Sequence, residues 1–153
     1  MISRRTLLTR FAALVAVLGA GPRALAQLKT PMTVYKDPSC GCCGKWVEHM
    51  EGHGFRAAVI NGDMPPVRAR LKVPDALQSC HTATVGGYVI EGHVPAEDVK
   101  KLLAQKPAGI LGLTIPGMPA SAPGMDMLPF RPYDVLTFTA EGRTTLFARH
   151  TKA

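Results

Sequence analysis

The segment YKDPSCGCCGKW, residues 35 to 46, places three of the chain's four cysteines within four positions. It overlaps the end of a short β-prone run, Met32 to Lys36, which an Asp-Pro-Ser break terminates. From Cys42 onward apolar residues recur at helical spacing until the glycines at 52 and 54. The cysteines are therefore expected where a strand turns into a helix. Unpaired N–H groups and the helix dipole at such a point favour a thiolate.

Beyond this helix the pattern predicts further alternation of strands and helices. Phe55 to Ile60 is expected to form a second strand, parallel to the first because a helix separates them. The next predicted elements are a short helix from Val67 to Leu71, a hairpin of strands Thr82 to Val85 and Tyr88 to Glu91 turned by Gly86-Gly87, and a helix from Pro95 to Gln105. The order β-α-β-α-β-β-α predicts an α/β fold of the thioredoxin-like kind.

The composition changes after Pro107. Residues 109 to 132 are rich in Pro, Gly and Met, and Pro-Gly-Met occurs at 116–118 and again at 123–125. We expect an irregular but ordered loop here, because the segment also carries several aliphatic residues. Asp134 to Phe138 and Thr144 to Ala148 are then expected to form a C-terminal β-hairpin.

The first 26 residues have the features of a bacterial export signal. A basic start with paired arginines precedes ten residues, Phe11 to Ala20, that are apolar or Gly, and Ala24-Leu25-Ala26 is a small-x-small cleavage site. Arginines followed by two leucines resemble a twin-arginine signal. A membrane-spanning helix is the alternative, but the apolar run is well short of the roughly 20 residues that a span needs. We expect cleavage near Ala26, leaving residues 27–153 as one periplasmic domain without a membrane segment.

The charge balance argues against a nucleic-acid partner. The chain has 18 basic and 11 acidic side chains, but four of the basic ones and none of the acidic ones lie in the export signal, so 14 face 11 in the remainder. These basic residues are scattered, without the stripe and interleaved aromatic residues of a nucleic-acid surface.

The four cysteines admit two readings that need no metal. Two disulfides allow three connectivities, of which Cys40–Cys43 with Cys42–Cys80 is the unstrained one. Alternatively, Cys40 and Cys43 have the CxxC spacing of a thiol-disulfide oxidoreductase, in which Cys40 would attack and Cys43 would resolve. In that case Cys42 would compete for the mixed disulfide.

A third reading is a copper site. Cys80 and His81 directly precede the predicted hairpin, which in a thioredoxin-like domain would bring them beside the first helix. Soft thiolate and thioether donors select Cu(I), and imidazole accepts either oxidation state of copper. Zinc and iron–sulfur sites remain alternatives, although the paired motifs typical of them are absent.

Other residues with metal-binding side chains have both a structural and a functional interpretation. His93 lies at a strand-to-helix corner, where it can serve as a ligand or as a cap, and Met118 and Met125 can contact copper or fill the core. His49 and His53, four apart on the first helix, are expected on its solvated face.

Three segments are similar to one known family. YKDPSCGCCGKW, LQSCHTATVGGYVIEGHVP at 77–95 and GLTIPGMPASAPGMD at 112–126 resemble the exported CopG-type metal-binding proteins found with bacterial copper-resistance genes. The resemblance implies a thioredoxin-like fold and a cysteine-bridged multinuclear copper site that cycles the ion between two oxidation states. Carried over by motif, the thiolate ligands are Cys40, Cys42, Cys43 and Cys80.

The resemblance leaves several roles open. His81 and His93 match the family's histidine-bearing segments without showing which of them touches metal. Two activities are compatible with the resemblance: a copper-dependent oxidoreductase, and a metal-binding protein that only holds the ion. The partners implied are copper ions and another periplasmic copper carrier or electron donor.

Overall fold

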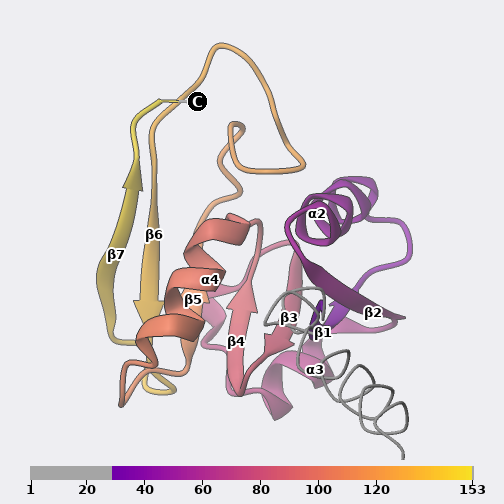
Figure 1. Ribbon diagram of the computed structural model, residues 1–153. Coiled ribbons are helices and arrows are strands. Elements are labelled where there is room, and N and C mark those ends of the chain that lie inside the picture. The colour runs from indigo at the N-terminus through magenta and orange to yellow at the C-terminus, as the bar shows by residue number, and fades with distance from the viewer. Residues whose placement is uncertain (1–28, 153) are drawn as a thin grey trace, which may run out of the picture.

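The computed structural model describes residues 29–152, and the expected export signal lies outside this range. The described chain is a mixed α/β structure built on a single seven-stranded sheet with the order β2-β1-β3-β4-β5-β6-β7 (Figure 1). Its strands are β1 (Thr30–Lys36), β2 (Phe55–Asn61), β3 (His81–Val85), β4 (Tyr88–Glu91), β5 (Gly112–Thr114), β6 (Tyr133–Phe138) and β7 (Thr144–His150). Its helices are α2 (Gly41–Gly52), α3 (Met64–Arg70), α4 (Ala96–Gln105) and the short 3₁₀ helix η2 (Asp75–Leu77). Within residues 29–152 no helix is long and apolar enough to cross a membrane.

Strand pairing follows the predicted order in the first half of the chain. β1 and β2 are parallel, as expected from the intervening helix α2. β3 runs antiparallel to β1, with Lys36 opposite His81, and β3 and β4 form the predicted hairpin. Gly86 and Gly87 form the turn of this hairpin. Their φ angles of 56° and 86° are positive, a backbone conformation that residues with a side chain rarely adopt.

Two predictions differ from the structure by more than one or two residues at an element's end. The segment expected to be irregular contains β5, which pairs with β4 on one side and β6 on the other and so joins the C-terminal hairpin to the sheet. A Cβ at Gly112 would lie 1.6 Å from the Val89 oxygen, so this strand depends on a close backbone approach that a hydrophobic pattern does not reveal. Helix α3 begins at Met64, ahead of the predicted Val67, because Pro is compatible with the first turn of a helix.

The core lies on both faces of the sheet. Ile90 belongs to a large cluster that includes Trp46 of α2 and Leu102 of α4, whereas its neighbour Val89 belongs to a smaller cluster with Phe138. Successive strand residues point to opposite faces, so the two clusters cover opposite faces of the sheet. Helices α2 and α4 therefore cover the same face of the sheet, and this packing fixes the position of the start of α2 relative to the strands.

The segment between β5 and β6 extends beyond the sheet on the side where α2 lies (Figure 1). Its second Pro-Gly-Met copy packs directly on that helix: a Cβ at Gly124 would lie 2.7 Å from the Trp46 backbone nitrogen and 3.1 Å from the Cys42 oxygen. The first copy has no such neighbour, because a Cβ at Gly117 would meet nothing within 4 Å. The loop is thus anchored to α2 through its second copy.

Replacing Gly124 by Ala should destabilise the protein more than the matched change at Gly117. Both glycines have positive φ angles, 83° and 75°, so each substitution carries about 1 kcal/mol of backbone strain. Only Gly124→Ala also pushes a methyl group into the backbone of α2, which should cost about 2 kcal/mol more. Urea unfolding of the two variants measures the difference, and equal free energies of unfolding would contradict this anchoring.

Candidate metal centre

Four cysteine sulfurs gather where β1 leads into α2. Cys40 is the residue before the helix, Cys42 and Cys43 lie in its first turn, and Cys80 directly precedes β3. The pairing of Lys36 with His81 places the end of β1 beside the start of β3, so cysteines 37 or more residues apart along the chain meet. All four sulfur atoms lie within 4.8 Å of one another. We call these four residues the sulfur cluster.

The sulfur cluster contains one disulfide and two free thiols. Cys40 and Cys43 are bonded, and Cys42 and Cys80 are free. The Cys42 sulfur is 3.6 Å from the Cys40 sulfur and 3.6 Å from the Cys80 sulfur. Cys43 is completely buried, whereas the other three are half-buried. The cluster is therefore reached from solvent through Cys40, Cys42 and Cys80.

A second group of donors adjoins the first at Cys43. The Cys43 sulfur and one ring nitrogen each of His81 and His93 lie within 4.8 Å of one another, and all three residues are buried. The His81 ring lies against the Trp46 ring with centroids 4.2 Å apart, and 5.0 Å from the His93 ring. We call Cys43, His81 and His93 the imidazole group.

The imidazole group has unsatisfied nitrogen atoms. Within the described chain neither ring nitrogen of His81 nor Nε2 of His93 has a hydrogen-bond partner, although all three atoms are buried. An unpaired buried polar atom lowers the free energy of unfolding by about 1–3 kcal/mol. A ligand that binds these nitrogens would remove this cost. Burial lowers the pKa of His81 well below its ordinary value and also lowers that of His93, which keeps both rings neutral as metal ligation requires.

The loop after β5 orients His93. The Nδ1 atom of His93 lies 2.7 Å from the Pro123 carbonyl oxygen, which can only accept a hydrogen bond, so Nδ1 carries the proton. In the neutral ring Nε2 then keeps its lone pair. Pro123 opens the Pro-Gly-Met copy that packs on α2, so this loop sets both the position and the tautomer of a candidate ligand.

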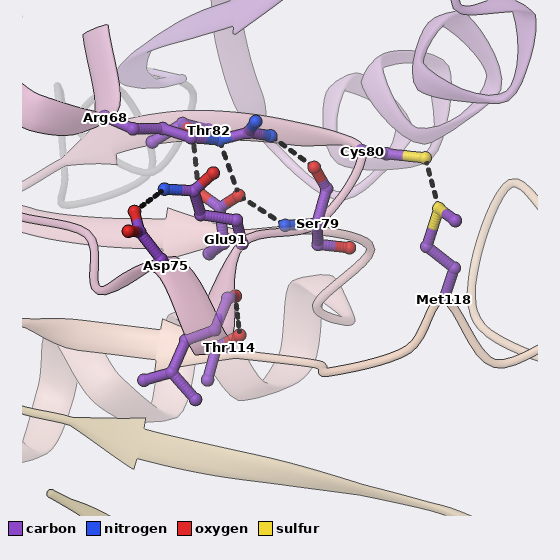
Figure 2. A network of polar contacts seen from close by, with 10 residues as sticks. Arg68, Asp75, Ser79, Cys80, Thr82, Glu91, Thr114 and Met118 are labelled. Atoms are coloured by element: carbon purple, nitrogen blue, oxygen red, sulfur yellow. Dashed lines mark hydrogen bonds and ion pairs between the residues drawn. The ribbon is translucent and has the colours of Figure 1, made fainter. Parts of the chain in front are cut away.

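The two predicted methionines lie in different surroundings. The Cys80 thiol points to Met118, and its sulfur is 2.9 Å from the Met118 sulfur (Figure 2). Met118 is 46% exposed, so it does not fill the core. Met125 is half-buried, and no hydrogen bond of its sulfur occurs in residues 29–152. The geometry thus places Met118, of the two, against the sulfur cluster.

Electrostatics around Cys80 oppose loss of its proton. Burial, followed by the hydrogen bond and charge of Cys42, raises the pKa of Cys80 to about 11. The Arg68 guanidinium acts in the opposite direction. Without a metal ion, Cys80 is therefore a protonated thiol at neutral pH, and binding of an ion would release that proton.

Sequence reasoning missed two polar features of the site. His49 is half-buried, and its Nε2 atom accepts a hydrogen bond from the Ala96 backbone at 3.2 Å, so its placement on a solvated face was wrong, whereas His53 is exposed. Glu91, at the end of β4, is completely buried and paired with Arg68 of α3. A lone acid ending an otherwise apolar strand was the only signal for this pair. Burial raises the pKa of Glu91, and its hydrogen bonds oppose this shift.

Fold and donor set together define an α/β protein with a cysteine- and histidine-rich candidate metal centre. A family described as "Protein of unknown function, DUF411" matches residues 77–125. Two solved structures, "Copper resistance protein copG- Form 1" and "Form 2", are 38% and 37% identical to the chain, each with a TM-score of 0.73, and each match covers 80% of this chain and 98% of theirs. No curated protein matches. The chain belongs to the CopG family of copper resistance proteins, which confirms the resemblance seen in its motifs.

Cys80 should react slowly with iodoacetamide. The thiolate is the reacting form, and a pKa of about 11 in place of 9.0 lowers its fraction about a hundredfold at pH 8. Peptide mass spectrometry of the alkylated protein measures the rate, with the urea-unfolded protein as the reference. Cys42→Ala should accelerate the reaction, because it removes the hydrogen bond with Cys42, the second cause of the shift. A Cys80 that reacts as fast in the folded as in the unfolded protein would contradict the expected burial.

Proposed function

We propose that this protein is an exported, periplasmic copper-binding protein that holds copper in a cysteine-rich, multinuclear site and cycles it between Cu(I) and Cu(II) in copper resistance. The observation that carries the proposal is the meeting of four sulfur atoms within 4.8 Å, next to two buried imidazoles with unsatisfied nitrogens. The names of the two similar solved structures support copper resistance as the process.

The chemistry of the donors fits copper better than zinc. Thiolate and thioether sulfur are soft ligands that favour Cu(I), whereas structural zinc sites use thiolate and imidazole in separated pairs. Here a thioether, Met118, adjoins Cys80. We assign Cys40, Cys42, Cys43 and Cys80 as thiolate ligands and His81, His93 and Met118 as further ligands. Met125 remains a candidate on sequence grounds alone.

The proposal of more than one ion rests on Cys43. Its sulfur belongs to both the sulfur cluster and the imidazole group. In the reduced protein a thiolate at this position can bridge two ions, one on each side. Cys42, with a cysteine sulfur 3.6 Å away on either side, is placed to do the same within the sulfur cluster.

Redox cycling is supported by the disulfide between Cys40 and Cys43. Two thiolates can each give one electron to a Cu(II) ion, which forms one disulfide bond and two Cu(I) ions. Electrons from a periplasmic donor would restore the thiolates. Cys42 and Cys80 stay reduced in the described structure and would keep hold of the ions in the meantime.

The fold supports a thioredoxin-like assignment for the first part of the domain. The order β2-β1-β3-β4, with β2 parallel to β1 and β3 antiparallel to both of its neighbours, is the arrangement expected of that fold. The cysteines at the start of α2 then occupy the position at which thioredoxin-like proteins carry their reactive thiols. Export, and cleavage near Ala26 to release residues 27–153, rest on the sequence of the first 26 residues.

Anaerobic titration of the reduced protein with Cu(I) tests the proposal. We expect more than one ion per chain and an ultraviolet thiolate-to-copper absorption band. Cys42→Ala should lower the Cu(I) affinity as much as Cys40→Ala, by at least about tenfold, because each removes a ligand. His53→Ala is the matched control, since His53 is exposed and outside both donor groups, and it should leave the affinity unchanged. Absence of tight binding by the parent protein would refute the proposal.

A thiol-disulfide oxidoreductase is the second candidate, and the difference in burial between Cys40 and Cys43 favours it. In such enzymes the attacking thiol is accessible and the resolving thiol is protected, as half-buried Cys40 and fully buried Cys43 are. An insulin-reduction assay separates the two functions. The copper protein should show little turnover, whereas an oxidoreductase should be active, should lose this activity in Cys40→Ala and should keep it in Cys42→Ala.

A further inference from the structure

The ion pair of buried Glu91 and largely buried Arg68 lies beside Ser79, the residue before Cys80 (Figure 2). The Glu91 side chain is 0% exposed and the Arg68 side chain 11% exposed, and their Oε1 and Nε atoms are 3.1 Å apart. Glu91 ends β4 and Arg68 comes from α3, which supplies no ligand to the proposed copper site. If the two residues affect the site, they do so through the residues that they contact.

The pair binds the backbone of Ser79, just before Cys80, and the side chain of Thr82, two residues after it. Ser79 donates its backbone N–H to Glu91 Oε1 at 2.7 Å, and its carbonyl accepts a hydrogen bond from Arg68 Nη2. On the other side of Cys80, the Thr82 hydroxyl donates to Glu91 Oε2 at 2.6 Å. Both backbone groups of Ser79 are thus bound by one ion pair.

Two further contacts hold residues 77–79, the segment that precedes Cys80. Thr114 of β5 donates its hydroxyl to the Leu77 carbonyl at 3.1 Å. Gly92, directly after Glu91, packs so closely that a Cβ there would lie 2.5 Å from the Ser79 hydroxyl oxygen. Residues 77–79 are therefore fixed from several strands, although they form no strand themselves.

Stability alone is a poor reason for such an arrangement. Burying two charges costs free energy that their attraction only partly returns, and apolar replacements of similar volume are often as stable. An ion pair fixes the positions of the groups that it contacts, because each of its hydrogen bonds requires a defined geometry. Here three of these bonds go to Ser79 and Thr82, which lie one residue before and two residues after Cys80.

Cys80 needs such support more than the other three thiols do. Cys40, Cys42 and Cys43 are placed together by the first turn of α2, whereas Cys80 reaches the sulfur cluster from a separate, non-helical segment. A ligand that is held in place before binding avoids the entropic cost of being ordered by the ion.

We propose that Glu91 and Arg68 are positioning residues, which hold Cys80 against Cys42 so that the sulfur cluster is formed before any ion binds. The purpose assigned to this arrangement rests on the proposed copper function. The positioning itself is a property of the metal-free protein and can be measured without copper.

The test measures how readily Cys42 and Cys80 form a disulfide in a chain that also carries Cys40→Ser and Cys43→Ala, which prevents exchange with the other thiols. Equilibration with reduced and oxidised glutathione gives the reduction potential of the pair, and hence its effective concentration. Glu91→Ala should lower this effective concentration by about tenfold or more, the equivalent of losing one hydrogen bond to a charged group. Glu91→Gln should stay within about threefold of the parent, because the amide oxygen can accept from Ser79 and Arg68 while the amide nitrogen donates to the Thr82 hydroxyl, which reverses only that one bond.

Asp134→Asn is the matched control. Asp134 pairs with Arg149 on the C-terminal hairpin, with Nε and Oδ1 2.7 Å apart, so this change removes an acid from another arginine pair and should leave the Cys42–Cys80 potential unchanged. If Glu91→Ala does not fold, Arg68→Lys decides, because lysine keeps the charge but cannot reproduce the guanidinium geometry that reaches both Glu91 and the Ser79 carbonyl. It should lower the effective concentration as well.

The outcomes separate positioning from stability and from copper binding. An unchanged potential in Glu91→Ala or Arg68→Lys, even with a lower free energy of unfolding in urea, would show a structural role only and overturn the proposal. A parent chain in which Cys42 and Cys80 do not pair would also overturn it. In the chain with all four cysteines, Glu91→Ala should also weaken Cu(I) binding by about tenfold. If the parent chain with all four cysteines binds no copper, the proposed function is refuted. The reduction potentials of the Cys42–Cys80 disulfide still show whether Glu91 and Arg68 position Cys80.

Discussion

The antiparallel pairing of β1 with β3 is the constraint on which the candidate site depends. It sets Lys36 opposite His81, so the chain leaves β1 toward the cysteines of α2 at the point where it enters β3 from Cys80. A shift of one residue in this pairing would turn His81 to the other face of the sheet and move Cys80 away from Cys42. The register is held by core packing of the two strands, with Val34 opposite Ala83 and neither exposed. The packing of the core therefore brings the metal-binding side chains together.

The site gathers polar groups that a stable core would normally exclude. Two imidazole rings have unsatisfied buried nitrogens, and a buried carboxylate pairs with a largely buried guanidinium beside Ser79, next to Cys80. Each carries a cost in free energy that apolar side chains would avoid. The costs fall at one end of the sheet, around the two donor groups, while the large cluster around Trp46 and Leu102 is apolar. This separation is expected when one part of a fold supplies stability and another supplies chemistry.

Much of the local structure could be predicted because it depends on near neighbours in the sequence. The helix after the cysteines, the Gly86-Gly87 hairpin and the C-terminal hairpin follow from periodicity and turn chemistry. Strand β5 could not be predicted in this way, since its three residues exist as a strand only between β4 and β6. The hydrogen bond from Ala96 to His49 likewise joins residues that only the packing of α2 against α4 brings together.

The sequence by itself determined the kinds of donor and their local grouping: three thiols at a helix start, a Cys-His pair before a hairpin, and a loop with repeated Pro-Gly-Met. Spacing along the chain is enough for this, because it sets which side chains share a turn. Only the tertiary structure decided that Cys43 adjoins both His81 and His93, that Met118 meets Cys80, and that Glu91 and Arg68 hold the segment between them. These are contacts between separate strands and loops, and their geometry is set by sheet register and by close packing of backbone on backbone, neither of which a local pattern encodes.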